Sequence, residues 1–199
     1  MRKVKSLIGL ALIVVGIVFV SIPLYHEWHR TKGVSALEGA LASLEVDPLH
    51  GSSQELTTQW TEEELKEVKT LEIPSIELEQ YVLGETTEEN LALALTQMNP
   101  NQTPGEGNFS IAGHRGYRGD RHFRQLSNVS DGDEVRLTAD GKTYVYEVNS
   151  ISIVEPTQLE VLDDSDEAEI TLITCTLSGE QRLIVKGVLL EVIEEAQAV

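Results

Sequence analysis

Residues 134–154 read EVRLTADGKTYVYEVNSISIV, a stretch with the pattern of a β-hairpin. Asp140-Gly141 at its centre favours a tight two-residue turn, because both residue types accept the positive φ that such a turn requires. The flanking segments, Glu134 to Thr138 and Lys142 to Val154, are predicted strands. The second is rich in tyrosine and valine, which favour extended backbone. We therefore expect β structure to dominate the fold.

Strand patterns recur on both sides of this hairpin. Apolar residues from Leu71 to Leu78 indicate strands interrupted at Pro74, and further strands are predicted over Asn108 to Ala112, Glu169 to Thr174 and Arg182 to Ile193. Capping boxes predict two short helices. One begins after Thr61 and continues to about Lys69, and the other follows Thr86-x-x-Glu89 and covers LALALTQM at 91–98. Six or more strands with two short helices indicate a mainly antiparallel barrel or sandwich.

The beginning of the chain has the features of a membrane anchor. Residues 7–24 read LIGLALIVVGIVFVSIPL and carry no charge. As a helix they would extend ~27 Å, close to the thickness of the hydrocarbon core of a bilayer. Basic residues before the run place the amino terminus in the cytoplasm, and aromatic residues after it suit the membrane interface: Arg2, Lys3 and Lys5, then Tyr25 and Trp28. A cleaved signal peptide is the alternative, but no A-x-A-like site closes the run.

These features divide the chain into four parts. We expect a cytoplasmic tail at 1–6, a transmembrane anchor at 7–24, an extracellular spacer at 25–68 and a β-rich domain at 69–199. Within the spacer, residues 35–44 have a weak helical pattern and residues 47–53 are rich in turn formers. The predicted location is the cell membrane, crossed once, with the main domain outside.

Composition excludes several classes of function. The formal charge is −18, from 33 acidic and 15 basic residues, which argues against a general nucleic-acid binder. The single cysteine excludes an intramolecular disulfide, CxxC redox chemistry and a cysteine-rich zinc site. The acidic run Asp163-Asp164-Ser165-Asp166-Glu167 lacks the glycine and spacing of an EF-hand calcium loop, so we predict a solvated loop there and neither a metal nor another cofactor.

Cys175 is the first candidate for chemistry, because it ends a predicted apolar strand. A lone cysteine is most often a small buried hydrophobe, and that alternative stays open. A thiol retained outside the cytoplasm at a strand end favours a nucleophile instead. Such a nucleophile needs a base or a cationic partner that holds it as the thiolate.

His114 is the best-placed partner among the five histidines. It follows the predicted strand at 108–112 and Gly113, so it too lies at a strand end and can meet Cys175 at one rim of a barrel. Arg182 begins the last strand, where a hairpin would bring its guanidinium near the sulfur to stabilise an oxyanion; an ordinary surface arginine is the alternative. The remaining histidines are assigned to the membrane interface (His26 and His29), the spacer (His50) and a solvated arginine-rich loop (His122).

Together these residues resemble the sortases, cysteine transpeptidases that attach proteins to the Gram-positive cell wall. Thr171-Leu172-Ile173-Thr174-Cys175 matches the TLxTC nucleophile motif of that family, Ala112-Gly113-His114-Arg115 its histidine segment, and Arg182-Leu183-Ile184-Val185 its arginine segment. The order of these motifs and the spacing between His114 and Cys175 are similar to those of the family. The resemblance covers roughly Lys69 to Ile193, and an amino-terminal anchor is also usual there.

The resemblance implies an eight-stranded barrel and a two-step acyl transfer. Cys175 would attack the bond after Thr in an LPXTG-like or LPXTA-like sorting signal, His114 would exchange protons with the leaving and incoming amines, and Arg182 would hold substrate and oxyanion. Ala112 and Thr174 would lie beside the substrate. The implied partners are surface proteins bearing the signal and the amine of a peptidoglycan precursor, with hydrolysis of the same signal as a further activity.

Three comparisons with other classes refine this expectation. The segment from Pro104 to Arg115 looks like class D sortases of bacilli, with class A as the alternative. An L,D-transpeptidase is disfavoured, because Ile173 stands where the SHGC motif of that family has its histidine. The non-enzymatic alternative is a catalytically inactive sortase-like domain that binds its partner outside the cell.

Overall fold

The computed structural model describes residues 2–45, 60–116 and 122–194. The chain separates into two compact units, Met1–Thr58 and Gln59–Val199, which we describe individually. In the first unit, α1 (Arg2–Glu45) is one continuous helix that includes the weak helical pattern at 35–44. The predicted turn-rich segment at 47–53 and His50 lie outside the described residues.

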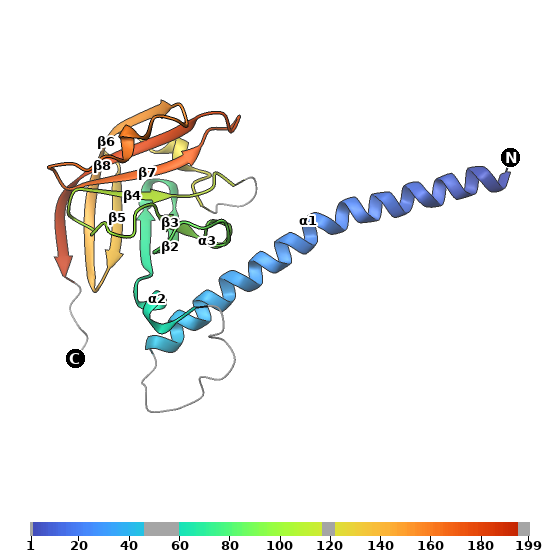
Figure 1. Ribbon diagram of the computed structural model, residues 1–199, viewed down its shortest axis with the longest axis horizontal. Helices are drawn as coiled ribbons and strands as arrows, with labels where there is room; N and C mark the ends of the chain where they lie inside the picture. The colour runs from blue at the N-terminus through green and yellow to red at the C-terminus, as the bar shows by residue number, and fades with distance from the viewer. Residues whose placement is uncertain (1, 46–59, 117–121, 195–199) are drawn as a thin grey trace. The chain divides into compact units, whose positions relative to one another are not determined.

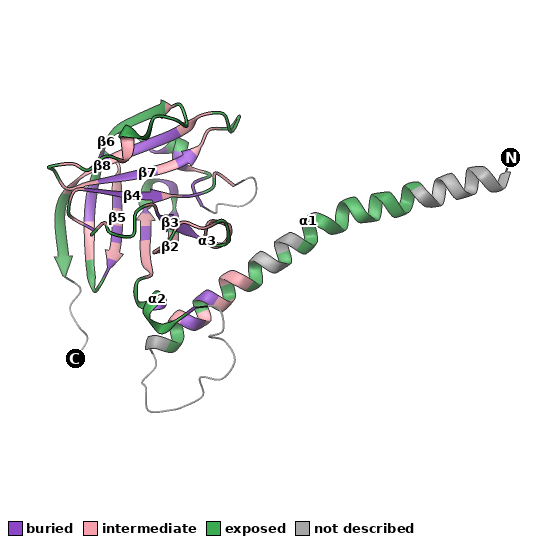
Figure 2. Cartoon of the chain, in the orientation of Figure 1, coloured by how far each residue is buried: buried purple, intermediate pink, exposed green. Residues whose placement is uncertain are grey.

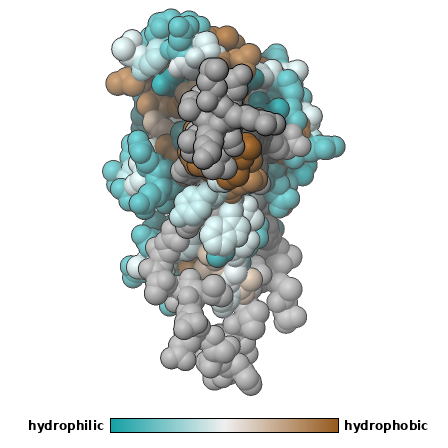
Figure 3. Space-filling model, turned by 90° about the vertical axis from the view of Figure 1, so that its right-hand side faces the viewer, coloured by the Kyte–Doolittle hydropathy of each residue, from teal (hydrophilic) through white to brown (hydrophobic). Residues whose placement is uncertain are grey.

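Apolar side chains of α1 are exposed between Leu12 and Leu24, among them Ile13, Phe19 and Val20. On the face that Figure 3 shows, apolar (brown) atoms lie among hydrophilic (teal) ones in the described part of the chain. Among the residues that the structure describes, no helix combines the length and the apolar character needed to cross a membrane. The anchor predicted over 7–24 is therefore not shown.

The second unit is a closed barrel of eight strands (Figure 1). The strands are β1 (Lys69–Ile73), β2 (Leu78–Leu83), β3 (Leu95–Gln97), β4 (Asn108–Ala112), β5 (Glu134–Ala139), β6 (Lys142–Val154), β7 (Glu169–Cys175) and β8 (Arg182–Glu194). Around the barrel they follow the order β1-β2-β3-β4-β7-β8-β6-β5. Pairing is antiparallel except between β2 and β3 and between β4 and β7. Of the two predicted architectures, the barrel is confirmed and the sandwich is wrong.

Short helices precede the first strand or join later ones. They are α2 (Glu62–Lys66), α3 (Glu88–Leu93) and the 3-10 turns η1 (Pro74–Ile76), η2 (Leu126–Asn128) and η3 (Leu159–Leu162). The capping box of α2 is confirmed, because the Thr61 hydroxyl accepts the Glu64 N–H while the Glu64 carboxylate accepts the Thr61 N–H. This reciprocal pairing satisfies two backbone donors that the helix leaves open.

The core of the barrel follows from the alternation of side chains along each strand. On β4 the inward residues are Phe109 and Ile111, and on β7 they are Ile170 and Leu172; all four are at most 1% exposed. Figure 2 shows that the buried residues of this unit lie mainly on its strands. The residues between them, at even numbers on β4 and at odd numbers on β7, therefore belong to the outer face of the barrel.

The helix predicted over 91–98 is wrong for most of its length. The helix α3 begins after Thr87, whose side chain caps Asn90 N–H, and it ends at Leu93 because Ala94 is extended. Leu95–Gln97 instead forms β3, which fills the place between β2 and β4 and is buried at all three residues. Tertiary pairing here overrides the local helical preference of LALAL, since three buried residues gain sheet partners and core contacts.

Tyr146 on β6 provides a stability test of this core. Its side chain is fully buried, its Oη accepts the Gly105 N–H at 3.0 Å, and burial raises the pKa of its phenol to about 12. The unfolded phenol titrates near pH 10 and the folded one higher, so stability contributed by the neutral phenol is present below about pH 10 and is lost as pH rises toward about 12.

We therefore expect Tyr146→Phe to have two effects. At pH 7 it should lower the free energy of unfolding by about 1 kcal/mol, because the N–H of the half-buried Gly105 loses its acceptor. Between about pH 10 and 12 the variant should lose ~2 kcal/mol less than the wild type, because it has no phenol to ionise. Urea titrations across this pH range measure both; parallel pH curves for the two proteins would contradict the prediction.

Candidate active site

Cys175 and Arg182 face each other across two antiparallel strands. Cys175 is the last residue of β7 and Arg182 the first of β8, and the two are direct register partners. Because Ile170 and Leu172 point inward, alternation puts Cys175 on the outer face of the barrel, and residues paired directly across strands share a face. The thiol is free and half-buried. The predicted hairpin is confirmed, because it pairs Arg182 with the last residue of β7.

His114 reaches the same place from β4. Strands β4 and β7 are parallel, and their register runs from Asn108 opposite Glu169 to Ala112 opposite Ile173. Two residues further along, the same register brings His114 beside Cys175. A hydrogen bond of 3.0 Å from Gly113 N–H to the Ile173 carbonyl continues the pairing beyond the end of β4. The exposed His114 therefore lies on the outer face, at the rim that carries Cys175 and Arg182.

Gly113 is required for this placement. Its position points inward, and a Cβ there would lie 2.4 Å from Leu95 Cδ2 and 2.8 Å from Phe123 Cδ2, both on fully buried side chains. The Gly113 carbonyl also accepts the Thr174 hydroxyl at 2.8 Å. Two hydrogen bonds and a close approach to the core thus hold the backbone immediately before His114.

Thr174 and Ala112, the predicted substrate contacts, have different positions. Ala112 is half-buried on the outer face, next to the rim. Thr174 is only 3% exposed and points inward, where its hydroxyl is used to hold Gly113. Its side chain therefore positions the His114 segment, while contact of either residue with substrate stays a prediction.

The short β7–β8 connection also engages Arg182. One guanidinium nitrogen, Nη1, donates to the carbonyls of Gly179 and Gln181 at 3.2 Å each. Gly179 has a φ of +78°, and its N–H bonds the Thr176 carbonyl, so a tight turn carries these acceptors. Since a guanidinium has five N–H donors, the remaining donors are available for a substrate oxygen.

The structure corrects the prediction for His122. We expected a solvated side chain, but His122 is 3% exposed and its ring lies edge-on to that of His114, with 6.5 Å between centroids. The backbone N–H of Phe123 donates to the His114 carbonyl at 3.1 Å, so His122 and Phe123 lie beside His114. The arginine-rich composition gave no indication that His122 is buried. The side chains of His26 and His29 lie outside the described part of the chain.

The acidic run at 163–167 is largely exposed, which confirms the predicted solvated loop. Within this run, the Asp164 carboxylate accepts the N–H groups of Asn108 and Ser165. Within the described residues, no three His, Cys, Asp or Glu side chains come together in a way that would hold a metal ion. The absence of a cofactor stays a prediction.

A thiol, an imidazole and a guanidinium lie at one rim of a closed β-barrel, and these are groups that enzymes with a cysteine nucleophile use. A model of the sortase domain family matches residues 71–190. The chain belongs to the sortases, a family of cysteine transpeptidases.

Individual relatives agree with this membership. Sortase A of Bacillus anthracis is 28% identical over 199 aligned residues, which cover 94% of each chain. Among solved structures, sortase A of Listeria monocytogenes is 29% identical with a TM-score of 0.63, over 66% of this chain and 92% of that one. A Clostridium perfringens sortase D5 transpeptidase is 32% identical with a TM-score of 0.58, over 63% and 79% of the two chains. The predicted family and barrel are thus confirmed.

Proposed function

We propose that this protein is a membrane-anchored transpeptidase that cleaves an LPXTG-like or LPXTA-like sorting signal after Thr and transfers the acyl group from Cys175 to a cell-wall precursor amine. The observation that carries the proposal is the strand register. It places His114 and Arg182 on either side of Cys175, on one face and at one rim of the barrel. The class D-like segment from Pro104 to Arg115 favours class D, with class A as the alternative.

The first step of the proposed reaction forms a thioester. The Cys175 sulfur attacks the carbonyl carbon of the signal's Thr, Arg182 donates hydrogen bonds to the oxyanion, and the C–N bond to the next residue breaks. His114, which took the proton of the Cys175 thiol as the sulfur attacked, gives that proton to the leaving amine. In the second step an incoming amine attacks the thioester, His114 accepts its proton, and Cys175 leaves as the thiolate; water in place of the amine gives hydrolysis.

The proposed location rests on the start of the chain. Eighteen uncharged residues at 7–24 follow Arg2, Lys3 and Lys5, and the described part of this run exposes large apolar side chains on α1. A single-pass anchor with the barrel outside the cell would bring the site to surface proteins and to peptidoglycan precursors.

The test is the intact mass of the full-length protein after incubation in detergent with LPXTG and LPXTA peptides, without an amine. A thioacyl adduct of the LPXT fragment supports the proposed enzyme, and the better peptide indicates the class. Folded protein with a titratable thiol and no adduct would instead support the inactive binding domain or a different signal.

Replacement of the Arg182 guanidinium is expected to lower the efficiency of the proposed reaction. Arg182→Lys should lower kcat/KM by about 10²-fold, because an ammonium cannot present the planar fork of N–H donors that reaches both the connection and an oxyanion. Peptide turnover followed by chromatography measures this. Glu180→Gln, which changes an exposed side chain of the same turn and leaves both carbonyls that Arg182 uses, is the control. Equal rates for Arg182→Lys and wild type would show that the guanidinium is an ordinary surface group.

A further inference from the structure

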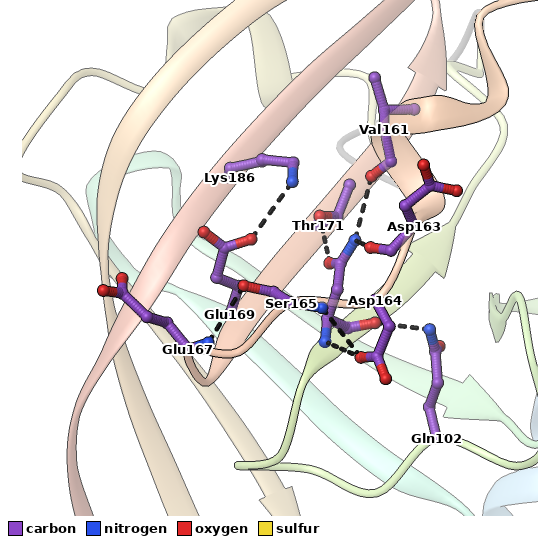
Figure 4. A network of polar contacts seen from close by, with 10 residues as sticks. Gln102, Val161, Asp163, Asp164, Ser165, Glu167, Glu169, Thr171 and Lys186 are labelled. Carbon is purple, nitrogen blue, oxygen red and sulfur yellow. Dashed lines mark hydrogen bonds and ion pairs between the residues drawn. The ribbon is translucent and has the colours of Figure 1, made fainter.

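Asn108, the first residue of β4, is buried although it belongs to the outer face of the barrel. Alternation puts it on the same face as Ala112 and His114, yet its exposed fraction is 0%. What covers it is the β6–β7 connection, residues 155–168. Asn108 Nδ2 donates to the carbonyls of Val161 at 3.0 Å and Asp163 at 2.9 Å. Figure 4 labels these two acceptor residues, together with Asp164 and Thr171.

The side-chain oxygen and the backbone N–H of Asn108 also have hydrogen-bond partners. Asn108 Oδ1 accepts the Thr171 hydroxyl from β7, which fixes the orientation of the amide. In return, Asp164 Oδ1 accepts the backbone N–H of Asn108 at 3.2 Å. Gly107 leaves room for that carboxylate, since a Cβ there would lie 2.0 Å from Asp164 Oδ1. We call the bonds of Asn108 to Val161, Asp163 and Asp164 the Asn108 latch.

The connection held by this latch borders the candidate site. It begins after Val154, the register partner of Arg182, and Gln181 Nε2 donates to Glu155 Oε1 at 2.8 Å. It ends at Glu169, the partner of Asn108 at the opposite end of β4 and β7. The chain thus leaves β6 beside Arg182 and reaches the outer face of β4 before it enters β7.

Between Glu155 and Val161, the described part of the chain offers this path few other supports, whereas Ala168 beyond it accepts the Leu189 N–H at 2.9 Å. Gln158 N–H bonds the Glu155 carbonyl, and Asp163 N–H bonds the Glu160 carbonyl, so these bonds stay within the connection. Leu159, on η3, is 64% exposed. One buried amide at the end of this path therefore restrains a long stretch of chain beside the site.

We propose that Asn108 is a positioning residue for substrate, because its latch holds residues 155–168 in the binding conformation before the substrate arrives. The inference rests on the proposed function and adds a determinant of substrate affinity to it. If residues 155–168 are ordered before substrate binds, binding does not have to order them. Loss of the Asn108 latch should therefore weaken substrate binding more than it slows the chemical step.

Asn108→Asp tests the latch with little change in volume. A carboxylate oxygen would replace Nδ2 and face the two carbonyls of Val161 and Asp163, while the second oxygen can still accept from Thr171. We expect KM for the sorting peptide to rise about tenfold with kcat within about threefold, since a lost buried hydrogen bond corresponds to roughly a tenfold change in an equilibrium. Hydrogen exchange, measured by mass spectrometry, should quicken in residues 155–168.

Ser110→Ala is the matched control. Ser110 is equally buried on the same face of β4, and its hydroxyl donates to Gln102 Oε1, which is not part of the connection. It should lower stability without raising KM and without faster exchange at 155–168. All measurements use the full-length protein in detergent.

The outcomes separate the latch from the proposed function. Unchanged KM and exchange in a folded Asn108→Asp variant would overturn the latch. So would faster exchange spread evenly over the barrel, which would make Asn108 a general stabiliser. If the wild type turned over no sorting peptide, the proposed function would fail, and the exchange data alone would then decide whether Asn108 holds the connection.

Discussion

Cys175→Ala is expected to abolish peptide turnover, with a loss of at least about 10³-fold in kcat, and to leave the fold intact. The mechanism needs a nucleophile at this position, and no second cysteine exists that could replace it. The side chain is half-buried at the end of β7, so its truncation should lower the free energy of unfolding by less than about 1 kcal/mol.

Two measurements check this expectation together. Turnover of the sorting peptide with an added amine reports the chemistry, and thermal unfolding reports the fold. Cys175→Ser is the matched variant, because it keeps the shape of the side chain but supplies a hydroxyl that is far less nucleophilic than a thiolate; it should be as inactive as Cys175→Ala. A variant that loses its fold would identify Cys175 as a structural residue, and retained turnover would eliminate the thioester mechanism.

Gly113→Ala is expected to have the second-largest effect, although Gly113 takes no part in the chemistry. The new Cβ would approach Leu95 Cδ2 at 2.4 Å and Phe123 Cδ2 at 2.8 Å, and neither buried side chain can move aside without repacking the core. We expect a loss of about 1–3 kcal/mol in the free energy of unfolding. The backbone before His114 should also shift, and a displacement of about 1 Å can cost about 10²-fold in rate.

The contacts suggest a control and a rescue. Gly84→Ala is the control, because its Cβ would meet only the flexible end of Glu67, at 3.1 Å; it should leave stability and rate almost unchanged. Adding Leu95→Val to Gly113→Ala removes the closest of the two clashes and should restore part of both losses. Wild-type stability and rate in Gly113→Ala would show that the core accommodates the methyl group and that the position of His114 does not depend on glycine.

Local patterns were sufficient wherever neighbouring residues decide the structure. The Asp140-Gly141 turn, with its flanking strands, and the Thr61 capping box depend on contacts within a few residues, and both were predicted from those residues. The structure of the LALAL segment was not predicted correctly, because β3 forms only where β2 and β4 lie on both sides as pairing partners. His122 was missed for the same kind of reason, since its surroundings include His114, which lies eight residues earlier in the chain.

By itself, the sequence determined the family, the candidate groups His114, Cys175 and Arg182, and their places at strand ends, because motifs and strand periodicity are properties of contiguous residues. Only the tertiary structure decided which groups share a face. The parallel register of β4 with β7 puts His114 beside Cys175, the Thr174 hydroxyl bonds the Gly113 carbonyl, and the β6–β7 connection buries Asn108. Each of these contacts joins segments that are distant in the sequence, and a shift of one residue between β4 and β7 would move His114 away from Cys175.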